Sequence, residues 1–129
     1  MEDELQSSIL IVDDSNINVR LVSKMIANLG HKIFIAENGV EALKLLTRVK
    51  PSMILLDIKM PKMDGFACCQ RIKKSASRAD IPVVFMSGSH DKRDIAKAKA
   101  VGGIGYLTKP IDSHLLKKEI EFNMPWASV

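Results

Sequence analysis

The sequence predicts a doubly wound α/β domain, in which helices cover both faces of a parallel sheet. Short apolar runs alternate with segments of helical period from one end of the chain to the other. These runs lack the apolar–polar alternation of half-exposed strands, which is typical of strands buried on both faces. The chain has 129 residues, a length that suits one domain with its own core rather than two.

Five apolar runs are predicted to be strands. Each is short and is bounded by charged or turn-forming residues, and the second is rich in β-branched and aromatic residues. The predicted strands are Ile9–Val12, Lys32–Ala36, Met53–Leu56, Pro82–Met86 and Gly105–Leu107. Because a helical segment separates each run from the next, successive strands should be joined by crossovers and lie parallel.

Five segments are predicted to be helices because apolar residues recur in them every three or four positions. They are Asn16–Leu29, Gly39–Arg48, Phe66–Lys74, Lys92–Val101 and a last helix that ends near Asn123. Gly30 and Pro51 supply stop signals for the first two. Asp112 or Ser113 is expected to cap the last helix.

The apolar stripes predict which side of each helix faces the core. On the first helix the predicted inward residues are Asn18, Val22, Met25, Ile26 and Leu29. On the second they are Val40, Leu43 and either Leu45 or Leu46, and on the last they are Leu115, Leu116 and Ile120.

Composition argues against several classes of protein. Apolar runs of four or five residues are too short to cross a bilayer, and the acidic start "MEDELQSS" is unlike a secretory signal. Cys68 and Cys69 are adjacent, so we expect free thiols in a reducing cytoplasm. The net charge of +4 comes from basic residues spread along the sequence. We therefore expect a solvated surface, with no direct binding of nucleic acid or membrane.

Charged or hydroxyl side chains follow four of the five predicted strands. Asp13 and Asp14 end the first, Asp57 the third and Ser87 the fourth, while Lys109 comes soon after the fifth. Each has an ordinary structural role available, such as a helix cap at Asp14 or a turn at Ser87. Because the carboxyl ends of parallel strands meet at one edge, we expect all five side chains to converge there.

The residue types indicate the chemistry of that edge. Three carboxylates repel one another unless a cation joins them, and carboxylate oxygens without histidine or thiolate ligands favour Mg²⁺. Lysine and serine are natural partners of phosphoryl oxygens. A carboxylate can also act as a nucleophile and form an acyl phosphate. The pattern predicts a magnesium-dependent site that places a phosphoryl group on a carboxylate.

Five motifs carry a resemblance to a known family. They are "ILIVDDS", "AENGVEAL", "MILLDIKMPKMDGF", "IPVVFMSG" and "GYLTKP", in this order along the chain. Together they resemble the receiver domain of two-component response regulators, across a single domain of residues 1–129 with a core of about 8–123. The resemblance implies a flavodoxin-like fold with five strands in the order 2-1-3-4-5.

The resemblance also implies a role for each site residue. Asp57 would be the phosphoacceptor, and Mg²⁺ would be bound by Asp13, Asp14, Asp57 and the backbone carbonyl of Lys59, with Asp14 as a direct ligand and Asp13 acting through water. Ser87 and Lys109 would bind phosphoryl oxygens, and Ser87 with Tyr106 would form the switch. A cis peptide between Lys109 and Pro110 would aim the lysine into the site.

The implied partners are proteins. The phosphoryl group would come from a histidine kinase or a histidine phosphotransfer protein, and a downstream protein would bind the face formed by residues 92–123. The chain's own His31, His90 and His114 are predicted to be surface residues. The segment "VDDSNINVRLV" is similar to receivers of hybrid histidine kinases and free-standing phosphorelay shuttles. No turnover of a small molecule is expected.

Two alternatives from other classes remain open at the level of sequence. A Mg²⁺-dependent phosphohydrolase with an aspartyl nucleophile would need a second acid two residues after Asp57, where Lys59 stands. A flavodoxin-like binder of nucleotide or flavin would need an uncharged phosphate loop after the first strand, where "DDSNIN" offers carboxylates.

Overall fold

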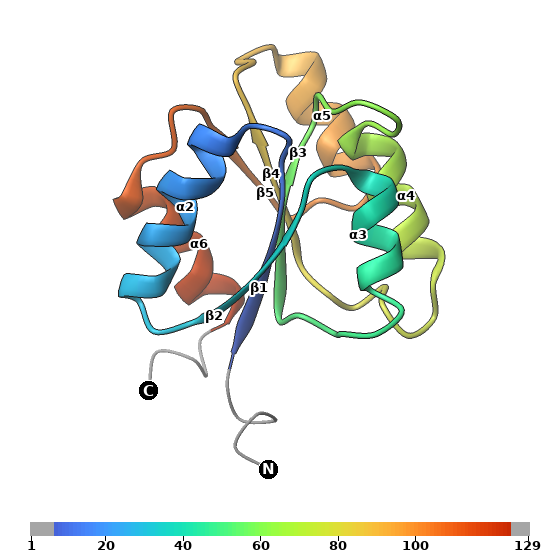
Figure 1. The fold of residues 1–129 in the computed structure, drawn as a ribbon. Coiled ribbons are helices and arrows are strands. Elements are labelled where there is room, and N and C mark those ends of the chain that lie inside the picture. The colour runs from blue at the N-terminus through green and yellow to red at the C-terminus, as the bar shows by residue number, and fades with distance from the viewer. Residues whose placement is uncertain (1–6, 125–129) are drawn as a thin grey trace.

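The computed structural model describes residues 7–124 and shows five parallel strands and five helices in alternation (Figure 1). The strands are β1 (Ser8–Val12), β2 (Lys32–Ala36), β3 (Met53–Asp57), β4 (Val83–Ser87) and β5 (Gly105–Thr108). The helices are α2 (Asn16–Asn28), α3 (Gly39–Leu45), α4 (Gly65–Lys74), α5 (Lys92–Ala100) and α6 (Ser113–Asn123). The sheet order is β2-β1-β3-β4-β5, so the predicted fold class and strand order are confirmed.

Helices cover both faces of the sheet. In Figure 1, α2 and α6 lie on one side and α3, α4 and α5 lie on the other. Alternate residues of the central strands supply the two cores. Ile9 and Ile11 of β1 pack in the layer under α2 and α6, whereas Leu10 and Val12 pack in the layer under the other three helices. All four side chains are fully buried, which explains why their run is continuously apolar.

Two helix predictions require correction. The helix predicted over Gly39–Arg48 ends at Leu45, because the next residues form turns in which Thr47 N–H donates to the Lys44 carbonyl and Arg48 N–H to that of Leu45. The prediction that Leu115 faces inward is wrong, since its side chain is half exposed whereas Leu116 and Ile120 are buried. Leu116 and Ile120 are four residues apart and share one face of the helix. Because a helix turns about 100° per residue, Leu115 lies outside that buried stripe.

Side-chain caps fix the starts of the helices that follow the strands. Ser15 caps α2 by accepting from the Asn18 N–H, and Asp112 caps α6 by accepting from two backbone N–H groups. Asp64 caps α4 in the same way. Among residues 7–124, no helix is long and apolar enough to cross a membrane.

Candidate functional site

The side chains that follow the strands do converge at one edge of the sheet. The register pairs Val12 with Leu56, Asp57 with Met86 and Ser87 with Thr108, so β1, β3, β4 and β5 end side by side. A cavity of about 330 Å³ lies there, lined by Asp14, Asp57, Lys59, Ser87, Gly88, Ser89 and Lys109. Asp13 does not line this cavity and is almost fully buried.

The three carboxylates form one cluster. Carboxylate oxygens of Asp13, Asp14 and Asp57 lie within 4.8 Å of one another. Asp13 and Asp57 are only 1% and 5% exposed, whereas Asp14 is exposed at the mouth of the cavity. Carboxylates so close together favour a divalent cation, and a set of hard oxygen ligands open to solvent fits Mg²⁺. These residues therefore fit the ion that the sequence analysis expects.

Lys109 is the cation at the centre of the cluster. Its ammonium lies 3.1 Å from Asp13 Oδ2 and 3.3 Å from Asp57 Oδ1. Burial alone would lower the pKa of Lys109, but its hydrogen bond to Asp13 and the charges of Asp57 and Asp13 outweigh burial and raise it. Lys109 therefore stays charged. The Lys109–Pro110 peptide bond is cis.

Asp57 is an unusually basic carboxylate. Burial and the nearby charge of Asp13 raise its pKa to about 6, against the opposing attraction of Lys109. When Asp57 is ionised, the single Lys109 ammonium cannot neutralise the three carboxylates, so this edge of the sheet carries net negative charge. A buried carboxylate with a raised pKa that lines a cavity has the properties of a nucleophile whose charge a cationic cofactor would balance.

Asn18 is a polar member of the site whose contact the sequence analysis did not anticipate. Its side-chain amide donates to Asp13 Oδ2 over 2.5 Å, and Asp13 Oδ1 accepts from the Ser15 N–H over 2.9 Å. Asp13 is thereby held by the first turn of α2. The available signal was a polar residue on the apolar stripe of a helix, in register with Val22 and Ile26, which indicates a polar partner in the core.

The backbone around Asp57 requires a glycine at position 65. A Cβ there would overlap the Asp57 carbonyl oxygen and lie 2.9 Å from Ile58 Cα. The Gly65 N–H donates to the Ile58 carbonyl over 2.8 Å. The start of α4 therefore packs directly against the end of β3, and this contact fixes the loop that carries Lys59.

A second group of polar contacts runs from the cavity toward β5. Ser87 is buried at the end of β4, and its hydroxyl accepts from the Ser89 N–H over 3.0 Å. Tyr106 of β5 donates its hydroxyl to the Ser89 carbonyl over 2.9 Å. The β4–α5 loop is thus hydrogen-bonded through Ser89 to both predicted switch residues, Ser87 at the end of β4 and Tyr106 of β5.

Other candidate groups lie away from this edge. His90 and His114 are exposed, but His31 is half-buried and hydrogen-bonded to Ser7, and burial lowers its pKa. The prediction that His31 is a surface residue therefore holds only in part. The thiols of Cys68 and Cys69 are free and buried, and burial raises their pKa values to about 12 and about 11. Both thiols therefore act as packing groups.

Comparisons with known proteins agree with this geometry. The family model described as the response regulator receiver domain matches residues 9–121. Protein PilH of Pseudomonas aeruginosa is 37% identical over 112 residues, which cover 87% of this chain and 93% of PilH. The crystal structure of the chemotaxis protein CheY4 of Vibrio cholerae superposes with a TM-score of 0.87 at 26% identity, covering 92% of this chain and 99% of CheY4.

Some relatives are much longer than this chain. A probable cyclic di-GMP phosphodiesterase of Vibrio cholerae is 35% identical over 124 residues, which cover 96% of this chain but only 28% of that protein. The matched unit therefore occurs both nearly alone and as one part of larger proteins.

Proposed function

Because this chain belongs to the response regulator receiver domain family of two-component systems, we propose that Asp57 is its phosphoacceptor. The observation that carries the proposal is the position of Asp57, whose buried carboxylate ends β3 beside two further carboxylates and 3.3 Å from the Lys109 ammonium. Neither of the other two carboxylates suits the role as well, since Asp13 does not line the cavity and Asp14 is exposed to solvent.

Mg²⁺ is the proposed cofactor. Asp14, Asp57 and the carbonyl of Lys59 would bind the ion directly, and Asp13 would bind it through water. When bound, the ion would neutralise charge on the phosphoryl oxygens as they approach a negatively charged nucleophile. The chain's own residues then orient the reaction, since Lys109 and Ser87 lie at the cavity and are suited to bind phosphoryl oxygens.

The proposed donor is a phosphohistidine of a histidine kinase or histidine phosphotransfer protein. An Asp57 carboxylate oxygen would form the new O–P bond as the N–P bond of the donor breaks. The electron pair of the N–P bond would return to the imidazole nitrogen. A ring already protonated on its other nitrogen leaves as neutral imidazole, and an unprotonated ring takes a proton from water. The product is an acyl phosphate whose added charge falls beside Lys109. A phosphohydrolase of this kind would need a second acid two positions after Asp57, and Lys59 stands there instead.

The phosphoryl group would act on a partner-binding face through Ser87 and Tyr106. Both are bonded to the β4–α5 loop through Ser89, so a movement of Ser87 toward the phosphoryl group would be felt at Tyr106. The Tyr106 ring also lines a cavity of about 630 Å³ beside α5, together with the half-exposed Ile95 and Ile104. We propose that a downstream protein binds this face, within residues 92–123.

The decisive experiment is phosphorylation by a small donor. With Mg²⁺ and acetyl phosphate, the wild type should gain one acid-labile, hydroxylamine-sensitive phosphoryl group, measured by intact-protein mass spectrometry. Asp57→Asn should gain none, while the control Asp64→Asn, which changes an exposed helix cap, should still be labelled. Beryllofluoride should bind only when Mg²⁺ is present. Labelling that persists in Asp57→Asn would place the nucleophile elsewhere.

A further inference from the structure

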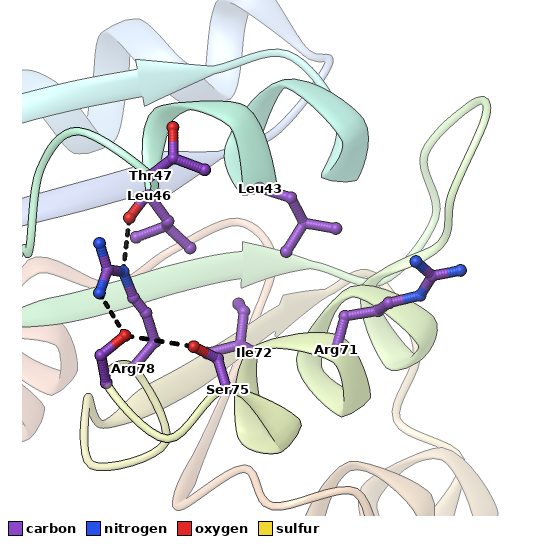
Figure 2. A pocket seen from close by; sticks show the side chains of 8 residues that line it. Leu43, Leu46, Thr47, Arg71, Ile72, Ser75 and Arg78 are labelled. Atoms are coloured by element: carbon purple, nitrogen blue, oxygen red, sulfur yellow. Dashed lines mark hydrogen bonds between the residues drawn. The ribbon is translucent and has the colours of Figure 1, made fainter.

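A second concave site lies between α3 and α4, apart from the edge that carries Asp57. It is a groove of about 360 Å³ with Leu43, Leu46 and Ile72 among its lining residues. Thr47 and Ser75 add hydroxyl groups, and Arg71 and Arg78 complete the charged part of the lining. Figure 2 shows the two arginines on opposite sides of the groove, with Leu43 and Ile72 between them.

The two arginines differ in whether their guanidinium groups are hydrogen-bonded within the protein. Arg78 is committed to the fold, because its Nε donates to the Leu46 carbonyl and one terminal nitrogen donates to the Ser77 hydroxyl. This arrangement joins the α4–β4 loop to the end of α3. Arg71 is exposed, and within residues 7–124 its guanidinium forms no hydrogen bond or ion pair with another side chain. Its donors are therefore available to a ligand.

The two segments around this groove carry a larger net positive charge than the whole chain. The segments 43–50 and 71–80, which form its two walls, contain seven basic residues and one acidic residue, a net charge of +6. The whole chain carries +4, so the remainder is slightly acidic. The single acid, Asp80, is paired with Lys50 at 3.3 Å, and no carboxylate lines the groove. Arg71 of the lining is exposed, as are Arg48 and Lys74, which adjoin the lining residues Thr47 and Ser75 in the sequence.

We propose that this groove binds an acidic peptide segment of a partner protein, with one apolar side chain of the segment placed between Leu43 and Ile72. Carboxylates on either side of that anchor would pair with Arg71 and its basic neighbours. Guanidinium groups bind carboxylates through two parallel hydrogen bonds, which gives such a contact direction as well as charge. The site is distinct from the proposed switch face beside α5.

The lining favours a peptide over other anionic partners. No aromatic residue lines the groove, so it offers no platform on which bases could stack. Its apolar residues form a floor rather than a protrusion, because Leu46 is 3% and Ile72 is 1% exposed. A floor of this kind cannot enter a bilayer, as membrane-surface binding would require. It can accept a single aliphatic side chain.

Docking in this groove should not depend on phosphorylation. The lining residues come from α3 and the turn after it, from the end of α4 and from the α4–β4 loop, and none of them lines the cavity at Asp57. Binding in this groove is therefore independent of whether Asp57 is the phosphoacceptor. A peptide should bind with equal affinity in the presence and absence of Mg²⁺ and beryllofluoride.

The test uses a fluorescein-labelled peptide with three glutamates on each side of a central leucine, followed by fluorescence anisotropy at physiological salt. The wild type should bind it, and Arg48→Gln combined with Arg71→Gln should weaken binding about tenfold or more, a loss of about 1.4 kcal/mol. Thr47→Trp, which places a bulky ring over the groove from an exposed position, should also abolish binding. Lys92→Gln combined with Lys99→Gln removes two exposed lysines of α5 and should leave binding unchanged.

Two further measurements distinguish the contribution of the leucine anchor from that of the glutamates. A peptide with alanine in place of the leucine should bind several-fold more weakly, and amide NMR shifts caused by the leucine peptide should centre on Leu43 and Ile72. An equal loss of binding in the α5 double variant would overturn the proposal in favour of unspecific charge attraction. Failure of the wild type to bind the peptide would also overturn it, as would a preference of the same arginines for duplex DNA or for vesicles of anionic lipid.

Discussion

At the scale of single residues, the site is a balance of unequal charges. Asp13 and Asp57 are buried and share one ammonium, that of Lys109, while Asp14 remains exposed. Asp13 is satisfied by Lys109, Asn18 and the Ser15 N–H. Asp57 has Lys109 alone among these groups, and its pKa is raised to about 6. Of the two buried carboxylates, the one with fewer fixed partners is therefore the one proposed to react.

The raised pKa of Asp57 predicts how metal-free stability depends on pH. The folded state binds the Asp57 proton more tightly than the unfolded state, whose pKa is 3.8, so this group lowers stability as pH rises from about 4 to about 6. Above that window the full penalty applies. Asp57→Asn should therefore stabilise the metal-free protein at neutral pH by about 1–2 kcal/mol, with the difference shrinking toward pH 4.

Urea unfolding of wild type and Asp57→Asn in EDTA, compared at several pH values, measures this difference. Because the two proteins share His31, whose lowered pKa makes it cost stability as pH falls below 6.5, that contribution cancels. A difference that stays constant from pH 4 to pH 8 would show that the Asp57 carboxylate carries no penalty in the fold.

Asp13 and Asp14 are adjacent but should respond differently to truncation. Asp13→Ala leaves the Asn18 amide and the Ser15 N–H without their acceptor and removes one of the two carboxylates that contact Lys109, a loss of roughly 2–4 kcal/mol. Asp14→Ala removes an exposed carboxylate and should change metal-free stability by less than about 0.5 kcal/mol. It should nevertheless weaken Mg²⁺ binding more than Asp13→Ala does.

Thermal unfolding in EDTA and Mg²⁺ titration by intrinsic fluorescence or NMR separate these two effects. Equal melting temperatures for the two variants would mean that the contacts of Asp13 with α2 contribute nothing to stability.

At the scale of elements, the site depends on how closely helix starts approach strand ends. The first turn of α2 supplies Ser15 and Asn18 to Asp13. The start of α4 approaches the backbone at Asp57 so closely that only glycine fits at position 65. Caps at Ser15 and Asp64 hold these two starts in place. The strand ends bring the carboxylates together, and the helix starts fix their orientation.

Gly65→Ala should therefore damage both the fold and the site. The added Cβ meets backbone atoms of Asp57 and Ile58, which cannot move aside as a side chain can, so we expect a loss of roughly 3 kcal/mol. Phosphorylation by acetyl phosphate should slow because the Asp57 and Lys59 backbone shifts. Gly88→Ala is the matched control, since nothing lies within 4 Å of a Cβ at that position, and it should change stability by less than about 0.5 kcal/mol.

Urea unfolding and the rate of phosphorylation measure the two effects for each variant. Wild-type values in Gly65→Ala would mean that the two backbones can separate without cost.

At the scale of the whole molecule, two surfaces differ in how they are connected to the proposed phosphorylation site. The face beside α5 is linked to the cavity by the hydrogen bonds of Ser87, Ser89 and Tyr106. The α3–α4 groove shares no lining residue with that cavity. The first surface is therefore suited to a phosphorylation-dependent partner and the second to a constant one.

Lys109 should link phosphorylation to the face beside α5. With Mg²⁺ present to neutralise charge, Lys109→Ala should still be phosphorylated, although more slowly. The phosphoryl group would then lose its tie to β5, so the changes that beryllofluoride causes around Ser87, Tyr106 and α6 in the wild type should be absent. Amide NMR or hydrogen exchange on both proteins measures this. The same changes in the variant as in the wild type would mean that Ser87 alone carries the switch.

The fold class and the sheet edge that carries the candidate site follow from the order of residues alone. Continuous apolar runs separated by helical segments require crossovers, and crossovers require parallel strands whose carboxyl ends meet. For that reason the convergence of Asp13, Asp14, Asp57, Ser87 and Lys109 could be predicted without coordinates. The motifs then supplied the order of the strands.

Which of these groups are paired, buried or free depends on contacts between elements that are distant in the sequence. Periodicity places a residue on a face but does not measure its exposure, which is why it predicts Leu115 inward and α3 too long. The partner of Asn18 could not be predicted because it lies on another element. The basic groove was invisible for the same reason. Its charges are divided between two segments that only the packing of α3 against α4 brings together, since charge density depends on distance in space rather than along the chain.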